Sequence, residues 1–279
     1  MPSTVTTLVE NRVAGNRTDL VSEHGLSFLV ETGDRRILFD TGASDRFLRN
    51  GTVLGLFPGP LDAMVLSHGH YDHAGGLPAL LSAMAEPVDL YAGPEIFAPR
   101  YIVRDGRRRE IGPPAPESAA AGLRFHPVEK PTVLAPGLAV SGEIPMVVDF
   151  ESADPAFLRE SPSGPVPDLF PEERVLVLET GDGPAVLVGC AHRGIVNALR
   201  HLSDAMGYAR IHAVLGGLHL MNAEPERIDR TIDAFRAFGV ERIGVGHCTG
   251  DAAISALDRA FPGRVFDIGA GTRIEFPDP

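Results

Sequence analysis

Short apolar runs separated by glycine-containing turns recur along the chain, and they predict strands that alternate with helices. Near the N-terminus, the runs Leu26–Glu31 and Arg36–Asp40 flank Thr32-Gly33-Asp34, which is typical of a hairpin. Two further short runs, Asp62–Leu66 and Val88–Tyr91, predict buried strands. Between these two, the apolar positions follow a helical period and predict a helix with one apolar face, made of Leu77, Leu80, Leu81 and Met84.

The C-terminal part shows the same alternation. Pro225–Phe238 is expected to be a helix, because proline suits the first helical turn and Gly239 suits the position after the last. Asp251–Ala260 is expected to be another helix, with Asp251 as its N-cap. The remaining expected elements are a helix at Ile195–Leu202 and strands at Val175–Thr180, Ala185–Val188, His212–Leu215, Arg242–Val245, Arg264–Ile268 and Thr272–Phe276.

A weak internal repeat connects the two parts of the chain. Leu29–Gly42 and Val177–Cys190 both place the tetrapeptide Glu-Thr-Gly-Asp at a hairpin between two apolar strands. Two interpretations stay open. The chain could contain two similar half-sheets that face each other with helices outside, or the two hairpins could match by chance.

The segment at about 94–172 differs from the rest. It holds 14 of the 24 prolines and a group of arginines, and Leu138–Ser141 is its best strand candidate. We therefore predict one domain over residues 1–279 with a Pro/Arg-rich insertion or lid in this segment. The arginines fit either a solvated loop or a clamp for an anionic substrate, and the clamp would use Arg107, Arg108 and Arg109, with Arg100 and Arg104 nearby.

Composition narrows the function classes. The 279 residues carry 25 basic and 37 acidic side chains, a formal charge of −12, which argues against binding to nucleic acid or to an anionic membrane. No apolar run reaches the roughly 18 residues of a spanning helix, and the N-terminus lacks the features of a secretory signal. With only two cysteines, we expect a cytoplasmic protein with reduced thiols. Its expected partner is a small-molecule substrate. A homo-oligomer is left open.

The strongest chemical signal is a cluster of three imidazoles and one carboxylate within six residues. His68, His70, Asp72 and His73 directly follow a predicted strand. In an extended loop, side chains two residues apart project the same way, so His68 and His70 can bind one cation. Neutral imidazoles with one carboxylate suit zinc, iron or manganese.

Further ligands are expected where other strands end. His192, His219 and His247 each follow a predicted strand and lie close to glycine, whereas His24, His126, His201 and His212 lack this context. Side chains at the carboxyl ends of strands commonly form sites in α/β proteins. His219 fits two roles equally, as a ligand or as a residue that contacts the substrate.

At this point the motifs resemble a known family. Ser67–His73 is similar to the HxHxDH signature of the metallo-β-lactamase superfamily, and Asp40 is similar to an earlier aspartate that shapes the metal loop. The resemblance implies an αββα sandwich of two mixed sheets flanked by helices. Four motifs are similar to the subfamily named for dihydropterin-aminobenzene-ribofuranosyl-phosphate synthase: Leu66–Leu77, Gly189–Asn197, Gly216–Leu220 and Gly246–Gly250.

The resemblance also implies ligand sets. One ion would be bound by His68, His70 and His192, and a second by Asp72, His73 and His247. Many relatives have a bridging aspartate after glycine where this chain has Cys190. Cys190 could replace that aspartate as a thiolate ligand, which would favour zinc, or the bridge could be absent, which would favour one ion.

The implied activity is metal-dependent hydrolysis by a metal-bound hydroxide on a small, anionic ester, lactone, thioester or phosphoester. Asp72 would orient the nucleophile, and His219, Thr249 or Tyr71 would donate a hydrogen bond to the developing oxyanion. For Tyr71, packing beneath the loop is the favoured alternative. Two alternatives stay open. One is a metal-dependent pterin-type synthase or transferase that forms a C–N or C–C bond. The other is a non-catalytic, metal-stabilised protein that binds a ligand.

Overall fold

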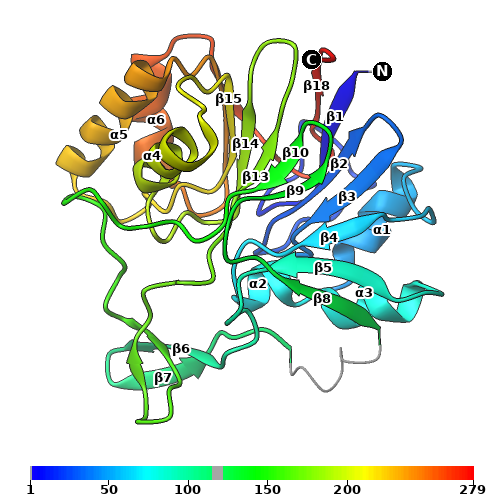
Figure 1. Ribbon diagram of the computed structural model, residues 1–279, viewed down its shortest axis with the longest axis horizontal. Helices are drawn as coiled ribbons and strands as arrows, with labels where there is room; N and C mark the ends of the chain where they lie inside the picture. The colour runs from blue at the N-terminus through cyan, green and yellow to red at the C-terminus, as the bar shows by residue number, and fades with distance from the viewer. Residues whose placement is uncertain (1, 115–121) are drawn as a thin grey trace.

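Two seven-stranded sheets face each other in the computed structural model, which describes residues 2–114 and 122–279 (Figure 1). The first sheet contains, in spatial order, β18 (Arg273–Phe276), β1 (Ser3–Val9), β2 (Ser27–Thr32), β3 (Arg35–Phe39), β4 (Ala63–Val65), β5 (Val88–Ala92) and β8 (Leu123–Pro127). The second contains β17 (Val265–Asp267), β16 (Arg242–Val245), β15 (Ala213–Gly216), β14 (Ala185–Val188), β13 (Leu176–Leu178), β10 (Leu138–Val140) and β9 (Thr132–Ala135).

The two sheets have the same pattern of strand directions. In the first, the pairs from β18 to β3 are antiparallel and those from β3 to β8 are parallel. In the second, the pairs from β9 to β14 are antiparallel and those from β14 to β17 are parallel. The repeated Glu-Thr-Gly-Asp hairpins, β2–β3 and β13–β14, therefore occupy equivalent places. This supports the interpretation as two half-sheets.

Helices cover the outer face of each sheet, so the chain has the predicted αββα architecture. The first sheet carries α1 (Arg46–Val53), α2 (Tyr71–Ala74) and α3 (Leu77–Ala83), and the second carries α4 (Ile195–Met206), α5 (Pro225–Phe238) and α6 (Asp251–Ala260). Alternation along β14 fixes the layers. Leu187 packs into the core between the sheets, while Val186 and Val188 pack into the core beneath α4, α5 and α6.

The segment at about 94–172 is divided among three sheets. Its strand β8 extends the first large sheet, and β9 and β10 form the edge of the second. Only β6 (Arg100–Arg104), β7 (Arg107–Glu110), β11 (Phe157–Arg159) and β12 (Val166–Pro167) form a separate four-stranded sheet, beside the two-sheet body (Figure 1). Residues 115–121 of the predicted insertion lie outside the described residues.

The structure differs from the expected elements in a few places. The strand β1 and the helix α1 were not predicted, and the N-cap of α6 is Gly250, with Asp251 inside the first turn. Within the two described ranges, no helix is both long and apolar enough for a membrane crossing.

Candidate metal centre

Loops from both sheets meet where their parallel strands end. Asp40 follows β3 and the segment Ser67–His73 follows β4, while Cys190, His219 and His247 come within three residues of the ends of β14, β15 and β16. Four of the six non-glycine residues with positive φ in the described chain lie in these loops: Asp40, Ala191, His219 and His247. Such conformations persist where the surrounding structure holds them, and they cluster at functional sites.

The first cluster consists of His68, His70 and His192. One ring nitrogen from each lies within 4.8 Å of the others, and the Nε2 atoms of all three are buried without a hydrogen-bond partner in the described structure. Burial lowers the pKa of His70 to about 3 and holds the pKa values of His68 and His192 well below the usual range. The three imidazoles are therefore neutral, which is the form that binds metals.

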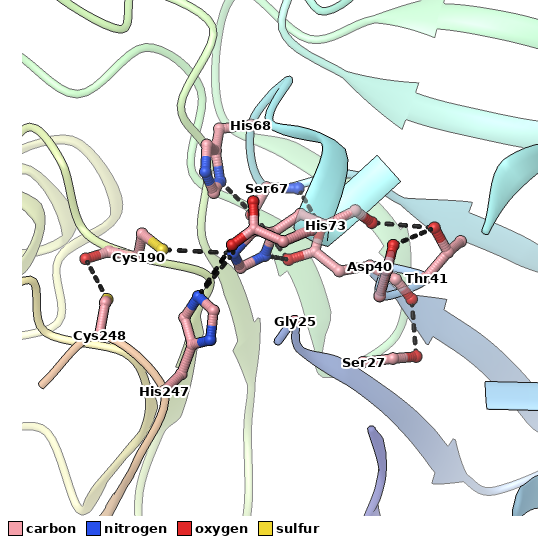
Figure 2. Close-up of polar contacts among 12 residues, drawn as sticks. Gly25, Ser27, Asp40, Thr41, Ser67, His68, His73, Cys190, His247 and Cys248 are labelled. Carbon is pink, nitrogen blue, oxygen red and sulfur yellow. Dashed lines mark hydrogen bonds and ion pairs between the residues drawn. The ribbon is translucent and has the colours of Figure 1, made fainter. Parts of the chain in front are cut away.

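Asp40 organises this loop from behind, as Figure 2 shows. Its carboxylate accepts hydrogen bonds from the backbone N–H and the hydroxyl of Ser67 and from Nδ1 of His73, all at 2.7 Å. Since the Ser67 hydroxyl proton points to Asp40, Nδ1 of His68 donates to Ser67 Oγ at 2.9 Å. This leaves the Nε2 lone pair of His68 directed into the cluster.

The second cluster joins Asp72, His73 and His247. Nε2 of His73 lies 3.1 Å from Nε2 of His247, and Oδ2 of Asp72 lies 3.4 Å from the latter and 3.9 Å from the former. Burial opposes the charge on His73, but Asp40 and Asp72 outweigh it and raise the pKa of His73 to about 9. The carboxylates that favour the charged form of this ring would also favour a divalent cation at the same place.

Cys190 lies between the two clusters. Its Sγ is 3.2 Å from Nε2 of His73, and these two residues also form a group of potential ligands with His68. Burial raises the pKa of the Cys190 thiol. The Cys248 side chain lies beside it, with Sγ 3.6 Å from the Cys190 carbonyl oxygen. A thiol in this position becomes a thiolate ligand only when a cation replaces its proton.

The donor sets fit metal ions. Three buried, unpartnered Nε2 atoms are unfavourable unless an electron-pair acceptor occupies the space between them. His68, His70 and His192 would hold one ion. Asp72, His73 and His247 would hold a second, and Cys190 is within reach of the ligands of both. The structure thus brings together all seven predicted ligands.

A buried carboxylate and a partly buried amide support these ligands from outside. Glu173 accepts hydrogen bonds from the backbone N–H groups of His192 and Arg193, both at 2.7 Å. Asn11 Oδ1 lies 3.1 Å from Nδ1 of His247 and fixes that ring. Neither residue was predicted from the sequence, because nothing in a single sequence indicates which acidic or amide side chain folds against a distant backbone.

His24 also lies at the second cluster, although its place in the sequence, before a strand, did not predict this. Its Nε2 lies 3.2 Å from Oδ2 of Asp72, and its ring stacks on His247 with centroids 5.1 Å apart. The hydrogen bond to Asp72 raises the pKa of His24. His24 precedes β2, whereas the other histidines follow strands. A search for histidines after predicted strands therefore could not find it.

A cavity of about 400 Å³ opens beside both clusters. His219 lines this cavity, and its Nδ1 atom is buried without a described partner. Tyr71 and Phe157 give the cavity aromatic walls. Its remaining lining includes Arg104, Arg109, Asp154, Met221, Asn222 and Arg227.

Most of the predicted substrate contacts are placed elsewhere. Arg109 lines the cavity, but Arg107 and Arg108 do not, since Arg108 stacks on Tyr101 at 3.5 Å on the outside of the small sheet. Thr249 is fully buried and its hydroxyl accepts a hydrogen bond from the Leu218 N–H at 3.1 Å. Its hydroxyl is therefore used within the loop structure. The structure therefore does not bring Arg107, Arg108 and Thr249 to the cavity wall, and their assignment to the substrate stays a prediction.

Comparison with known proteins agrees with this geometry. A sequence profile of the metallo-beta-lactamase superfamily matches residues 22–247. The chain is 32% identical to 7,8-dihydropterin-6-methyl-4-(beta-D-ribofuranosyl)-aminobenzene-5'-phosphate synthase of Methanocaldococcus jannaschii, over 97% of this chain and 95% of that protein.

Solved structures show the same similarity. The crystal structure of Tm1679, described as a metal-dependent hydrolase of the beta-lactamase superfamily, superposes with a TM-score of 0.87 at 30% identity and covers 99% of this chain and 100% of that one. Zn²⁺-bound PqqB from Methylobacterium extorquens shares the fold, with a TM-score of 0.57 at 15% identity, and covers 97% and 99% of the two chains.

Proposed function

The chain belongs to the metallo-beta-lactamase superfamily, and from that premise we propose that it is a metal-dependent hydrolase of a small, anionic ester, lactone, thioester or phosphoester. One observation carries the proposal: three buried, unpartnered histidine Nε2 atoms converge beside a cavity large enough for a small organic substrate. The ligand chemistry favours Zn²⁺ if Cys190 binds as a thiolate, and iron or manganese also suit the histidines and Asp72.

A bound cation would supply Lewis acidity and would lower the pKa of a bound water to about 7. The chain's own groups would complete the site. Asp72 lies within 3.4 Å of the imidazole nitrogens of His24 and His247 and lines the cavity, so it would orient the attacking water. His219 would donate a hydrogen bond to the oxygen on which negative charge develops, because its Nδ1 is unpaired in the cavity wall.

The small sheet would close the site over the substrate. Ile102 and Arg104 come from β6, Arg109 from β7 and Phe157 from β11, and all four line the cavity. We therefore assign the lid role to this small sheet alone. The strands β8, β9 and β10 of the same segment belong to the two large sheets and are not part of the proposed lid.

The test combines elemental analysis with activity profiling. Protein purified without added metal is analysed for bound ions and then assayed on esters, lactones, thioesters and phosphodiesters. We expect turnover of one class that is abolished by chelation and by His70→Ala, whereas His126→Ala, which changes a histidine paired with Asp89 away from the cavity, keeps the wild-type rate. Metal-loaded protein that turns over no class would contradict hydrolysis and favour a ligand-binding role.

A second candidate is a pterin-type synthase or transferase. It is favoured by the 32% identity to a synthase over nearly the whole of both chains, and by the aromatic side chains of Tyr71 and Phe157, which suit flat rings. The assay supplies a pterin together with an arylamine phosphate and searches by mass spectrometry for a product that contains both. Such a product, with no hydrolysis of single substrates, would establish this candidate over the first.

A further inference from the structure

Arg227 presents an unsatisfied guanidinium to the wall of the cavity. It lies in the first turn of α5 and lines the same cavity as His219 and the metal ligands. Its Nε and Nη2 atoms are buried and have no hydrogen-bond partner among the described residues. By contrast, Arg104 in the same cavity is paired with Asp154 at 3.2 Å. An unpaired buried donor is costly, so its place in a cavity wall indicates an acceptor supplied by a ligand.

The neighbouring carboxylates are already engaged. Glu151 and Glu173 are the carboxylates whose charges act on Arg227. Both oxygens of Glu151 accept N–H groups of α4, from Val196 at 2.9 Å and Asn197 at 2.7 Å. Both oxygens of Glu173 likewise accept backbone N–H groups. These carboxylates offset part of the charge on Arg227 without pairing with it, and burial lowers the pKa of Arg227 from its usual value.

We propose that Arg227 is the anion-recognition residue of the cavity and binds a phosphate or carboxylate group at the non-reacting end of the substrate. The reacting end would lie at His219 and the metal ligands, which line the same space. A guanidinium binds either oxyanion through two parallel N–H donors, and in a protein of formal charge −12 a local cation is needed to hold an anionic substrate. The inference rests on the proposed function for the identity of the ligand as a substrate.

The test measures binding without turnover. Wild type, Arg227→Gln and Arg227→Lys are titrated in metal-free form with phenylphosphonate and with benzoate by isothermal titration calorimetry. Arg236→Gln is the matched control, because Arg236 lies in the same helix, pairs with Asp233 at 3.0 Å and does not line the cavity. The tighter of the two probes identifies the oxyanion class.

We expect Arg227→Gln to weaken the tighter probe by about 10-fold to 100-fold, Arg227→Lys to weaken it less, and Arg236→Gln to leave it unchanged. The melting temperature of Arg227→Gln should equal or exceed that of wild type, because no partner loses its bond. The proposal is overturned if wild type binds neither probe, if Arg227→Gln binds like wild type, or if Arg227→Gln melts well below wild type. None of these results depends on hydrolysis. A failure of the anion-recognition proposal can therefore be distinguished from a failure of the proposed hydrolase function.

Discussion

Nε2 of His73 lies 3.1 Å from Nε2 of His247, although 174 residues separate the two histidines in the chain. Each ring directs its other nitrogen to a fixed oxygen, at 2.7 Å to Asp40 and 3.1 Å to Asn11. Because one histidine follows a strand of the first sheet and the other a strand of the second, the site forms only when the two half-sheets are packed together. We therefore expect folding and metal binding to be coupled in this chain.

Asp40 is expected to control both properties. In Asp40→Asn one carboxylate oxygen becomes an N–H donor facing groups that themselves donate, so a buried donor is left unpaired. We expect the unfolding free energy to fall by roughly 1–3 kcal/mol and the metal affinity to fall about 10-fold to 100-fold. Urea denaturation and competition with a chelating dye measure the two effects. Asp34→Asn, at an exposed hairpin turn, should change neither.

Removing metal should destabilise the wild type more than a ligand variant. A ligand held at 100 times its dissociation constant adds about 2.7 kcal/mol to the folded state. We expect a chelator to lower the melting temperature of wild type and to lower that of His247→Ala by a smaller amount. In His126→Ala the shift should match wild type, since His126 pairs with Asp89 at the sheet edge. Equal shifts in all three proteins would show that His247 binds no stabilising ion.

Spectroscopy of the cobalt-substituted protein should show whether Cys190 binds the metal as a thiolate. Its Sγ lies 3.2 Å from Nε2 of His73, so a cation bound at His73 can also bind the thiolate. Cobalt-substituted protein is then expected to show a sulfur-to-metal charge-transfer band. The band should be lost in Cys190→Ser and kept in Cys248→Ser. If Cys248→Ser alone removes it, the neighbouring thiol is the ligand, and if no band appears in wild type, the site uses only nitrogen and oxygen.

Asp89 gives a pH prediction far from the metal ligands. Hydrogen bonds from Arg124 and His126 lower the pKa of Asp89 to about 2, and they tie β8 to β5. A lowered carboxyl pKa stabilises the fold above the unfolded value of 3.8 and loses this effect as the pH falls through about 2. The groups are partly exposed, so Asp89→Asn should cost less than about 1 kcal/mol at neutral pH. Urea titrations should show this difference shrinking between about pH 4 and pH 2.

Much of the fold could be predicted because the apolar periodicity of many segments matches the helix or strand that they form. The runs around α5 and α6 have clear helical periods, and the predicted bounds Pro225–Phe238 and Asp251–Ala260 are those observed. The repeated hairpins indicated two equivalent sheets. By contrast, β7 is a run of four exposed charged residues, Arg107–Glu110, without the apolar alternation that marks a strand. Its pairing with β6 depends on tertiary structure, which the pattern does not contain.

The site could be predicted in part for a similar reason. His192, His219 and His247 follow strands, and the carboxyl ends of parallel strands meet at one edge, so their convergence with His68 follows from topology. His24 comes from the loop before β2. Because β2 is antiparallel to β3, the start of β2 lies at the same sheet edge as the ends of β3 and β4, and this brings His24 to Asp72. Nothing in the sequence distinguishes Arg227 from a solvent-exposed helix residue. Only the folded structure shows that its Nε and Nη2 atoms are buried without a hydrogen-bond partner.

Arg100 is expected to hold the histidine loop through buried ion pairs. It is fully buried, with Nε 3.1 Å from Asp168 and Nη2 2.7 Å from Glu172, and Glu172 also accepts the backbone N–H of Gly69 at 3.4 Å. Arg100→Met leaves two buried carboxylates without a cation and should cost roughly 3–5 kcal/mol. Metal affinity should fall as well, since Gly69 lies between His68 and His70.

The control for Arg100 is Arg17→Met, which breaks an exposed pair with Asp19 and should leave the unfolding free energy essentially unchanged. A second variant separates charge from packing. Combining Arg100→Met with Asp168→Asn and Glu172→Gln removes the stranded charges, so it should recover part of the lost unfolding free energy in urea denaturation. If the triple variant is less stable than Arg100→Met, the carboxylates contribute through their hydrogen bonds to the backbone, and the ion pair is not what holds the loop.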